Sequence, residues 1–263
     1  MKLSVVIPAY NEEGSLMETV ETLFEALQKR GIPHEIVVVN DNSKDRTDSV
    51  LKMLQQYIPT LIYYTNIGPN GFGYAVRFGL ERFRGDCVAV MMADLSDDPE
   101  DLIRFYDKMI SENVDCVFGS RFIKGGVTRD YPKLKKAINR TANFIVKVTM
   151  GMRYNDTTNA FKLYKRETIQ GLQPLLAPHF NLTIELPLKA IVRGYSYVVL
   201  PNSWTNRKTG ESKLKIREMG SRYFFILCYC LIEKFFSRGD YHRETVEKSR
   251  KKILEIADRD NGI

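Results

Sequence analysis

Carboxylates stand directly after two runs of strand-forming residues. The apolar residues 36–39 lead to Asp41, and residues 88–92 lead to Asp94 and then Asp97. A buried parallel strand reads as a continuous apolar run, and ligands of open α/β sheets lie beyond the carboxyl ends of such strands. Both acidic segments should therefore face one crevice. Carboxylates there suit a hard divalent cation that carries phosphate groups, as Mg²⁺ usually does in proteins.

The elements that must position these residues alternate between strand and helix. We expect strands at 5–7, 35–40, 61–64, 86–92 and 115–119, and helices at 16–30, 45–57, 74–83 and 99–112. This alternation predicts an α/β fold, a mostly parallel sheet with helices on both faces. Beyond residue 120 we expect helices at 133–150, 181–193 and 242–258 and a strand at 195–200. A Gly-rich fingerprint after the first strand and a GxxxxGK loop are both missing, which argues against dinucleotide and P-loop nucleotide sites.

Charge is distributed unevenly along the 263 residues. Residues 1–120 carry 11 Lys/Arg and 19 Asp/Glu, whereas residues 121–263 carry 28 and 13. An acidic half suits a metal, and a basic half suits phosphates or an anionic surface. The basic half has neither aromatic–basic interleaving nor a recognised nucleic-acid module, so we expect no nucleic-acid partner.

The cellular location follows from what the sequence does not contain. Four cysteines without zinc or disulfide spacing, at positions 87, 116, 228 and 230, are expected to be buried thiols. We expect no signal segment and no membrane-spanning run, and hence a cytoplasmic protein. The apolar run 223–232 is flanked by basic residues, and the helix at 133–150 is rich in lysine. These two segments suit the interface of an anionic membrane. The alternative is that the run packs onto the catalytic domain or forms a dimer contact.

Several ordered motifs resemble those of family 2 glycosyltransferases. They are Val5-Val6-Ile7-Pro8-Ala9-Tyr10-Asn11-Glu12-Glu13, residues 38–47, Asn66-x-Gly68 with Gly73, Ala75, Val76 and Gly79, Ala93-Asp94-Leu95-Ser96 with Pro99, Gly119-Ser120-Arg121-Phe122, Gly125-Gly126, Asp156-Thr157 with Phe161, and residues 207–213. The last of them, Arg-Lys-Thr-Gly-Glu-Ser-Lys, is similar to a motif of the dolichol-phosphate mannosyltransferase-like branch. Together they cover residues 3–216.

The resemblance implies a GT-A fold and inverting transfer of a hexose from a GDP- or UDP-linked donor to a polyprenyl phosphate, for cell-surface glycan or glycoprotein synthesis. It implies Mg²⁺ or Mn²⁺ as cofactor. It also implies a catalytic domain over 1–216, with a nucleotide and metal half at 1–120 and an acceptor half at 121–216. A C-terminal helical extension would occupy 217–263. The oligomeric state is left open.

The resemblance also assigns roles to individual residues. Those expected to line the nucleotide site are Pro8, Tyr10, Glu12, Val39, Asp41, which reaches the base, and Ala93. Asp94 is the expected metal ligand, with Ser96 beside it. Arg121, Arg207 and Lys213 are expected to bind the diphosphate or the acceptor phosphate. Such cations stabilise the charge that builds on a leaving nucleoside diphosphate.

One position departs from the family pattern. The metal motif usually begins with Asp, but this chain has Met92-Ala93-Asp94. We expect metal binding to survive through Asp94, with Asp97 or Asp98 compensating. The alternative is an enzyme whose metal dependence is weakened or lost.

The nature of the acceptor decides whether a general base is needed. A phosphate acceptor is already anionic, whereas a sugar hydroxyl must lose a proton to a group within hydrogen-bond reach. Glu185 is the candidate base, and its alternative role is structural or acceptor-orienting. Two further functions stay open at this point. One is a soluble transferase that acts on a saccharide hydroxyl in polysaccharide assembly, and the other is a non-catalytic nucleotide-sugar-binding module.

Overall fold

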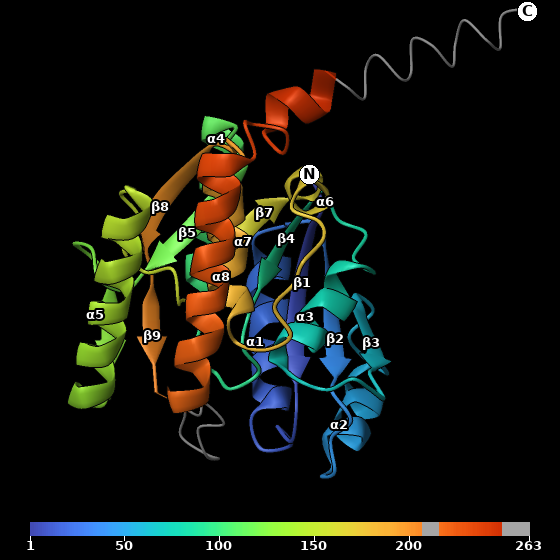
Figure 1. Cartoon of the computed structure of the whole chain (residues 1–263). Helices are drawn as coiled ribbons and strands as arrows, with labels where there is room; N and C mark the ends of the chain where they lie inside the picture. Colours follow the sequence, from blue (N-terminus) through green and yellow to red (C-terminus); the bar gives the residue numbers. More distant parts are fainter. Residues whose placement is uncertain (207–215, 249–263) are drawn as a thin grey trace, which may run out of the picture.

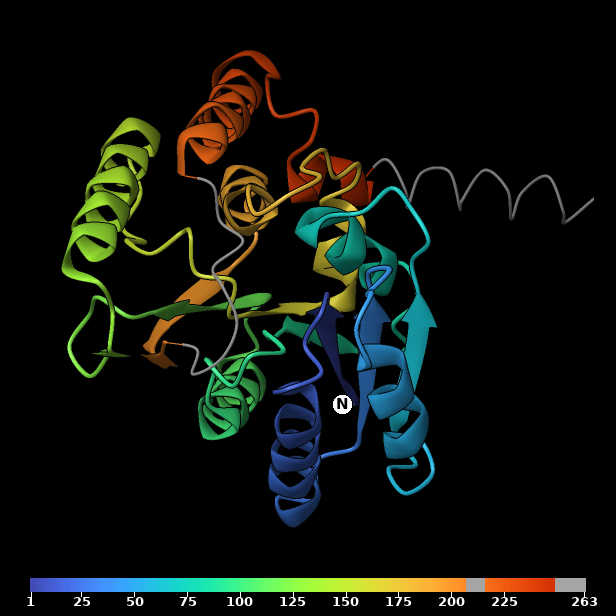
Figure 2. The ribbon, with the colours of Figure 1, turned by 90° about the horizontal axis from the view of Figure 1, so that it is seen from below.

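The computed structural model describes residues 1–206 and 216–248. A sheet of seven strands forms the middle layer, with helices on both faces, as predicted for an α/β fold (Figure 2). The strand order is β3-β2-β1-β4-β7-β5-β8, comprising β1 (Leu3–Ala9), β2 (His34–Asn40), β3 (Leu61–Thr65), β4 (Cys87–Val90), β5 (Cys116–Ser120), β7 (Lys162–Lys165) and β8 (Tyr197–Pro201). A second small sheet pairs β6 (Val127–Arg129) with β9 (Ser203–Thr205).

Strand β7 departs from the parallel pattern. It lies between β4 and β5 and runs antiparallel to both, and it leads directly into the short helix α6 (Arg166–Gly171). Neither element was predicted from the sequence. The strand has only four residues, Lys-Leu-Tyr-Lys, so it is too short for its alternation to stand out. Its central position in the sheet nevertheless buries Leu163 and Tyr164 almost completely.

Two apolar cores lie on the two faces of the sheet. The first core is covered by α1 (Leu16–Lys29), α2 (Thr47–Leu54) and α4 (Pro99–Glu112). The second core is covered by α3 (Phe72–Leu80), α6, α7 (Leu182–Val192) and α8 (Ile216–Phe236), and α5 (Lys133–Met150) lies at its side (Figures 1 and 2). Helix α1 shows why the helices pack on the sheet. Its Leu16, Val20, Leu23 and Leu27 recur at helical spacing, so they form one apolar side, and they are fully buried. Helices α2 and α3 differ by two to three residues per end from the expected ranges, since apolar periodicity locates the middle of a helix better than its ends.

Helix α5 turns its apolar stripe away from the protein. Leu134 is 74% exposed, and Ile138, Ile145 and Val148 on the same side are exposed as well. The inward side is held instead by the buried Asn143. Its amide donates to Thr158 Oγ1 at 2.9 Å and accepts from Thr157 Oγ1 at 2.8 Å. Asn143 and the buried Val146 and Met150 therefore attach this helix, and the apolar stripe from Leu134 to Val148 is left on the surface.

Helix α8 has one apolar side packed and the other exposed. Ile226 and Cys230 are fully buried against the second core, and Glu233 forms a buried two-pronged ion pair with Arg193, the C-cap of α7, at 2.7 and 2.9 Å. The opposite side carries exposed apolar residues, namely Phe224, Phe225, Ile232 and Phe235. The packing alternative thus holds for one side of the run 223–232, whereas contact of the exposed side with a membrane stays a prediction.

Candidate functional site

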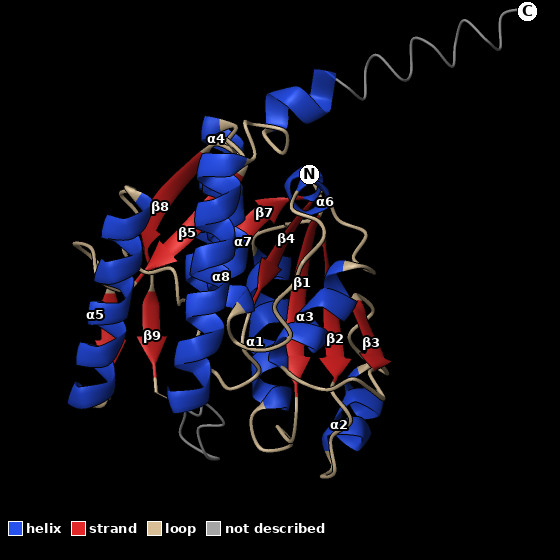
Figure 3. Ribbon diagram, in the orientation of Figure 1, coloured by secondary structure: helices blue, strands red, loops and turns tan. Residues whose placement is uncertain are grey.

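The carboxyl ends of four strands meet at one edge of the sheet. β1 pairs in parallel with β2 and β4, and β5 points the same way because β7 runs antiparallel to both β4 and β5 (Figure 3). The residues that directly follow these strands are Tyr10, Asp41, the segment 91–96 and Arg121. The topology therefore brings the predicted site residues Tyr10, Asp41, Asp94 and Arg121 to a common edge.

The loops after β1 and β2 are tied to each other by hydrogen bonds. Backbone N–H groups of residues 11, 12 and 13 donate to Ser43 Oγ at 3.0 Å, Thr47 Oγ1 at 3.0 Å and Asp45 Oδ2 at 3.1 Å. In the other direction, the N–H of Lys44 donates to Asn11 Oδ1 at 2.7 Å. Burial alone would raise the pKa of Asp45, but the hydrogen bonds from the Thr47 hydroxyl and backbone outweigh it and lower that pKa. The motif at 43–47 thus positions the turn that carries Tyr10 and Glu12.

Asp41 is engaged within the protein. Its carboxylate accepts from Asn66 Nδ2 at 2.8 Å, Asn70 Nδ2 at 3.0 Å and the N–H of Gly71 at 2.7 Å, and the residue is only 5% exposed. These bonds hold the loop 66–71 over the end of β2. A contact between Asp41 and the base stays a prediction. Pro8, Val39 and Ala93 are buried beside the same strand ends, whereas Tyr10 is exposed.

The segment after β4 carries the predicted metal ligands. The carbonyl of Ala93 accepts from Ser15 Oγ at 2.8 Å and from Thr19 Oγ1 at 3.1 Å, which ties the segment to the start of α1. Asp94 Oδ1 accepts from the N–H of Ser96 at 3.2 Å. The Ser96 hydroxyl is buried and has no hydrogen-bond partner in the described part of the chain. A buried hydroxyl beside a carboxylate fits an oxygen-ligated divalent cation, so Asp94 and Ser96 are compatible with the predicted Mg²⁺ or Mn²⁺.

Asp97 and Asp98 each accept a hydrogen bond from a nearby backbone N–H. Asp98 caps helix α4 by accepting from the N–H of Glu100 at 2.9 Å. Asp97 Oδ2 accepts from the N–H of Met92 at 3.0 Å. Burial, aided by the charge of Asp94, raises the pKa of Asp97 to about 7. That Asp97 or Asp98 compensates for the missing carboxylate stays a prediction, and in the structure one oxygen of each also shapes the segment.

Arg121 is buried in an ion pair that the sequence did not reveal. Its Nε and Nη2 donate to the two oxygens of Asp156 at 2.9 and 2.7 Å, and its backbone N–H donates to the same carboxylate at 2.9 Å. Burial alone would lower the pKa of Arg121, but the Asp156 carboxylate raises it above its ordinary value. Most of the guanidinium is thereby committed to the protein. A direct role in phosphate binding stays a prediction.

Lys162 is a second buried cation beside this pair. Its ammonium donates to the carbonyl oxygens of Thr157 and Thr183 at 3.1 and 3.2 Å, and to that of Asn159. Burial lowers the pKa of Lys162 to about 7. The sequence signal for it was weak, since it lies on the strand that was not predicted. It joins the loop at 157–159 to the start of α7.

Glu185 is placed as a structural group and not as a base. It is fully buried, and its oxygens accept from the N–H groups of Leu176 and Ala177, both at 2.7 Å. The same carboxylate pairs with the buried Lys189 at 2.7 Å, one helical turn further on. A carboxylate held in this way does not reach an acceptor hydroxyl, so the geometry favours the structural alternative. Arg207 and Lys213, which complete the predicted site, lie outside the described residues.

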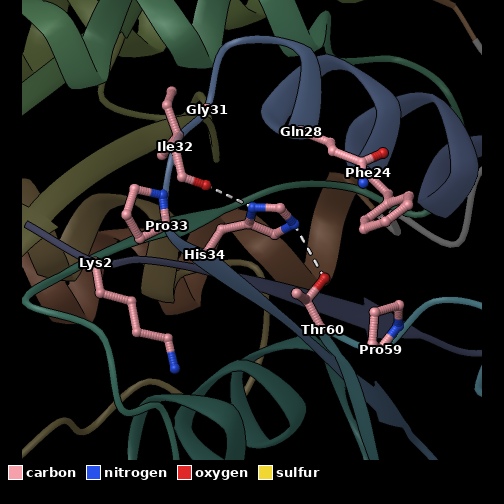
Figure 4. A pocket seen from close by; sticks show the side chains of 9 residues that line it. All are labelled: Lys2, Phe24, Gln28, Gly31, Ile32, Pro33, His34, Pro59 and Thr60. Atoms are coloured by element: carbon pink, nitrogen blue, oxygen red, sulfur yellow. Dashed lines mark hydrogen bonds between the residues drawn. The ribbon is translucent and has the colours of Figure 1, made fainter.

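A pocket of about 450 Å³ lies away from this site (Figure 4). It is lined near the starts of β1, β2 and β3, at the amino edge of the sheet. Both ring nitrogens of His34 in this pocket are engaged, with the carbonyl of Ile32 at 2.7 Å and with Thr60 Oγ1 at 3.0 Å. Because the pocket is lined near the strand starts, it lies at the sheet edge opposite to the acidic strand ends.

The fold and the edge of acidic strand ends together define a GT-A-like α/β protein. The model of the family described as glycosyl transferase family 2 matches residues 4–172, and the chain belongs to that family. Among solved structures, glucosyl-3-phosphoglycerate synthase from Mycobacterium tuberculosis, in complex with Mn²⁺, uridine diphosphate and phosphoglyceric acid, has the same fold. The TM-score is 0.67 at 16% identity, over 88% of this chain and 78% of that one.

Two curated relatives are more similar in sequence. A dolichol-phosphate mannosyltransferase from Pyrococcus furiosus is 33% identical over 82% of this chain and 60% of its own length. A polyprenol monophosphomannose synthase from Mycolicibacterium smegmatis is 31% identical over 80% of each chain. The chain thus spans less than two thirds of the first of these relatives.

Proposed function

We propose that this protein is an inverting glycosyltransferase that moves a hexose from a GDP- or UDP-linked donor to a polyprenyl phosphate. The observation that carries the proposal is the similarity to two polyprenol-phosphate mannosyltransferases across about four fifths of the chain. The site supports the proposal, because the loops at 10–13 and 41–47, which are joined by hydrogen bonds, lie with the segment 93–96 at one sheet edge. The domain division at residue 216 stays part of this proposal.

The chemistry requires charge neutralisation more than proton transfer. As the bond to the sugar breaks, negative charge grows on the departing diphosphate, and preorganised cations lower that barrier. A divalent cation bound by Asp94 and Ser96 would supply Lewis-acid stabilisation there. Arg207 and Lys213 are proposed to add further positive charge. The remaining residues of the edge bind and orient the nucleotide.

The structural role of the buried Glu185 favours a phosphate as acceptor. An acceptor hydroxyl needs a base, and the candidate base is occupied by Lys189 and two backbone N–H groups. A phosphate oxygen is ionised near neutral pH and attacks without proton removal. A polyprenyl phosphate therefore suits this site better than a saccharide hydroxyl does.

The test is nucleoside-diphosphate release from a panel of GDP- and UDP-hexoses with Mn²⁺ or Mg²⁺, with and without a short polyprenyl phosphate. We expect one donor to be turned over, and only when the lipid phosphate is present. Release that needs a saccharide instead would assign the protein to polysaccharide assembly. Donor binding without release under any condition would point to a binding module.

We further propose that the protein docks on an anionic membrane surface, where such an acceptor resides. No described helix is long and apolar enough to cross a membrane. The outward sides of α5 and α8 instead offer large exposed apolar side chains, such as Leu134 at 74% and Phe224 at 66%. Helix α5 adds five basic residues, Lys133, Lys135, Lys136, Arg140 and Lys147, and no acidic one. This combination of an apolar stripe and positive charge fits an anionic bilayer.

Replacing four of these apolar residues by serine should strongly weaken membrane binding. The variant combines Leu134→Ser, Ile145→Ser, Phe224→Ser and Phe235→Ser, all at exposed positions. Each large apolar side chain contributes roughly 1.5–3 kcal/mol on burial, so we expect vesicle affinity to fall more than about tenfold. Flotation with phosphatidylserine vesicles at low salt measures it.

The matched control is the double variant Met53→Ser and Ile110→Ser, whose exposed side chains lie on the helices of the opposite sheet face. It should float as the unaltered protein does. If the unaltered protein stays in the soluble fraction, membrane docking is refuted. A concentration-dependent dimer that the serine variant abolishes would assign these sides to a second copy of the chain.

A further inference from the structure

Glu185, in the first turn of α7, holds the backbone that precedes this helix. Its two carboxylate oxygens accept from the N–H groups of Leu176 and Ala177, both at 2.7 Å. Lys189 pairs with the same carboxylate and also donates to the carbonyl oxygen of Pro174. Glu185 and Lys189 are both fully buried, so water does not replace these bonds when one of them is lost. The backbone ahead of α7 is therefore fixed by one carboxylate.

The held backbone packs directly on the start of α3. A Cβ atom at Gly73 would lie 2.5 Å from the carbonyl oxygen of Ala177, so only a glycine allows the two backbones to approach this closely. The N–H of Tyr74 donates to the carbonyl oxygen of Pro178 at 3.2 Å. A shift of the backbone at 177–178 would therefore shift the first turn of α3.

The first turn of α3 is joined to the loop over the end of β2. The N–H of Gly71, the residue before α3, donates to Asp41 Oδ2 at 2.7 Å. The ring of Phe72, the next residue, stacks on that of Phe180 with the ring centres 4.4 Å apart. The place of this loop over Asp41 is thus linked to the backbone that Glu185 holds.

We propose that Glu185 is a positioning residue for the nucleotide. It fixes the backbone ahead of α7, which fixes the start of α3 and, through Gly71, the loop that covers Asp41. A residue of the predicted acceptor half thereby shapes the pocket of the donor. The inference rests on the proposed use of a nucleotide-sugar donor, and it gives Glu185 a role other than that of a base.

The first test is Glu185→Gln, which keeps the size of the side chain but sets an amide donor against a backbone N–H. We expect the dissociation constant of the preferred nucleotide, GDP or UDP with Mn²⁺, to rise about tenfold, the equivalent of one lost hydrogen bond. In turnover assays, KM for the donor should rise while kcat stays nearly unchanged, since only binding is altered. A base would show the reverse, a fall in kcat at unchanged KM.

Asp115→Asn is the matched control for Glu185→Gln. Asp115 is also a buried carboxylate that accepts from a backbone N–H, that of Ser196 at 2.9 Å, but it lies before β5 at the opposite edge of the sheet. Both variants should melt at a lower temperature than the unaltered protein. Only Glu185→Gln should bind the nucleotide more weakly.

The second test leaves the buried ion pair intact, so it decides the matter if Glu185→Gln does not fold. Gly73→Ala adds a methyl group at the close contact with Ala177 and should raise the same dissociation constant to a similar extent. Gly220→Ala is its control, because a Cβ atom there meets no atom within 4 Å, and it should bind the nucleotide as the unaltered protein does.

The inference is overturned if folded Glu185→Gln keeps the nucleotide affinity or lowers kcat at unchanged KM. Where Glu185→Gln does not fold, an unchanged affinity of Gly73→Ala overturns it. Nucleotide affinity is measured without lipid and without turnover. A loss of affinity in a protein that shows no lipid-dependent release would therefore refute the proposed reaction and leave this inference standing.

Discussion

Asp94→Asn is expected to lower kcat/KM for the preferred donor by about 10²–10³-fold, the loss typical when a preorganised stabiliser of developing charge is removed. Asp94 is the one carboxylate at this strand end, within the described residues, that neither caps a helix nor closes the turn through Met92. Asn keeps the shape and can still accept from the N–H of Ser96. The loss should therefore come from the missing charge, and steady-state kinetics with the lipid phosphate measures it.

Asp98→Asn is the matched control for this prediction. It removes one negative charge from the same segment, but Asn caps helices about as well as Asp does, so α4 should keep its start. Its kcat/KM should stay within a few-fold of the unaltered protein. If Asp94→Asn is as active as Asp98→Asn, the charge of Asp94 is not used and the reaction proceeds without a metal at this position.

Asp156→Ala is expected to reduce the free energy of unfolding by about 3–5 kcal/mol. The substitution leaves the guanidinium of Arg121 buried without its two-pronged partner and also frees the backbone N–H of Arg121. An unpaired buried charge is far more costly than the loss of the pair itself. Because whole domains have only about 5–15 kcal/mol to lose, the variant should be much less resistant to urea. Equilibrium urea unfolding measures the change, and the slope of the unfolding free energy against urea concentration is compared between variants.

Two comparisons separate this prediction from a general effect of removing acidic groups. Asp107→Ala breaks the ion pair with Arg30, whose side chains are 59% and 48% exposed, so its effect should be below about 1 kcal/mol. The double change Arg121→Met with Asp156→Leu removes both charges and should recover part of the loss. An effect of Asp156→Ala as small as that of Asp107→Ala would show that the Arg121 pair does not support the fold.

The sequence was sufficient for those parts of the fold that repeat. The continuous apolar strands β1 and β2 and the periodic helices α1 and α4 were predicted within two residues, because burial on a regular element imposes a regular pattern. The same regularity placed Asp41 and Asp94 at one edge, since parallel strands align their carboxyl ends. Short elements contain too few residues to show such a pattern, so β7 was not predicted although it lies inside the sheet.

The tertiary structure decided which polar groups are used up inside the protein. Glu185 and Arg121 have the residue types of a base and a phosphate ligand, yet Lys189 and Asp156 occupy them. Asp156 lies 35 residues from Arg121, and the backbone groups of Leu176 and Ala177 that hold Glu185 lie outside its helix. The spacing of Glu185 and Lys189 is local, but their burial together depends on the tertiary structure. The apolar stripe of α5 is a similar case. Its spacing determined that one side is apolar, but the packing of Asn143 on the loop at 157–158 and of Val146 and Met150 in the second core decided that this side faces outward. Periodicity records which residues share a side, whereas the choice of neighbour depends on how distant segments fit together.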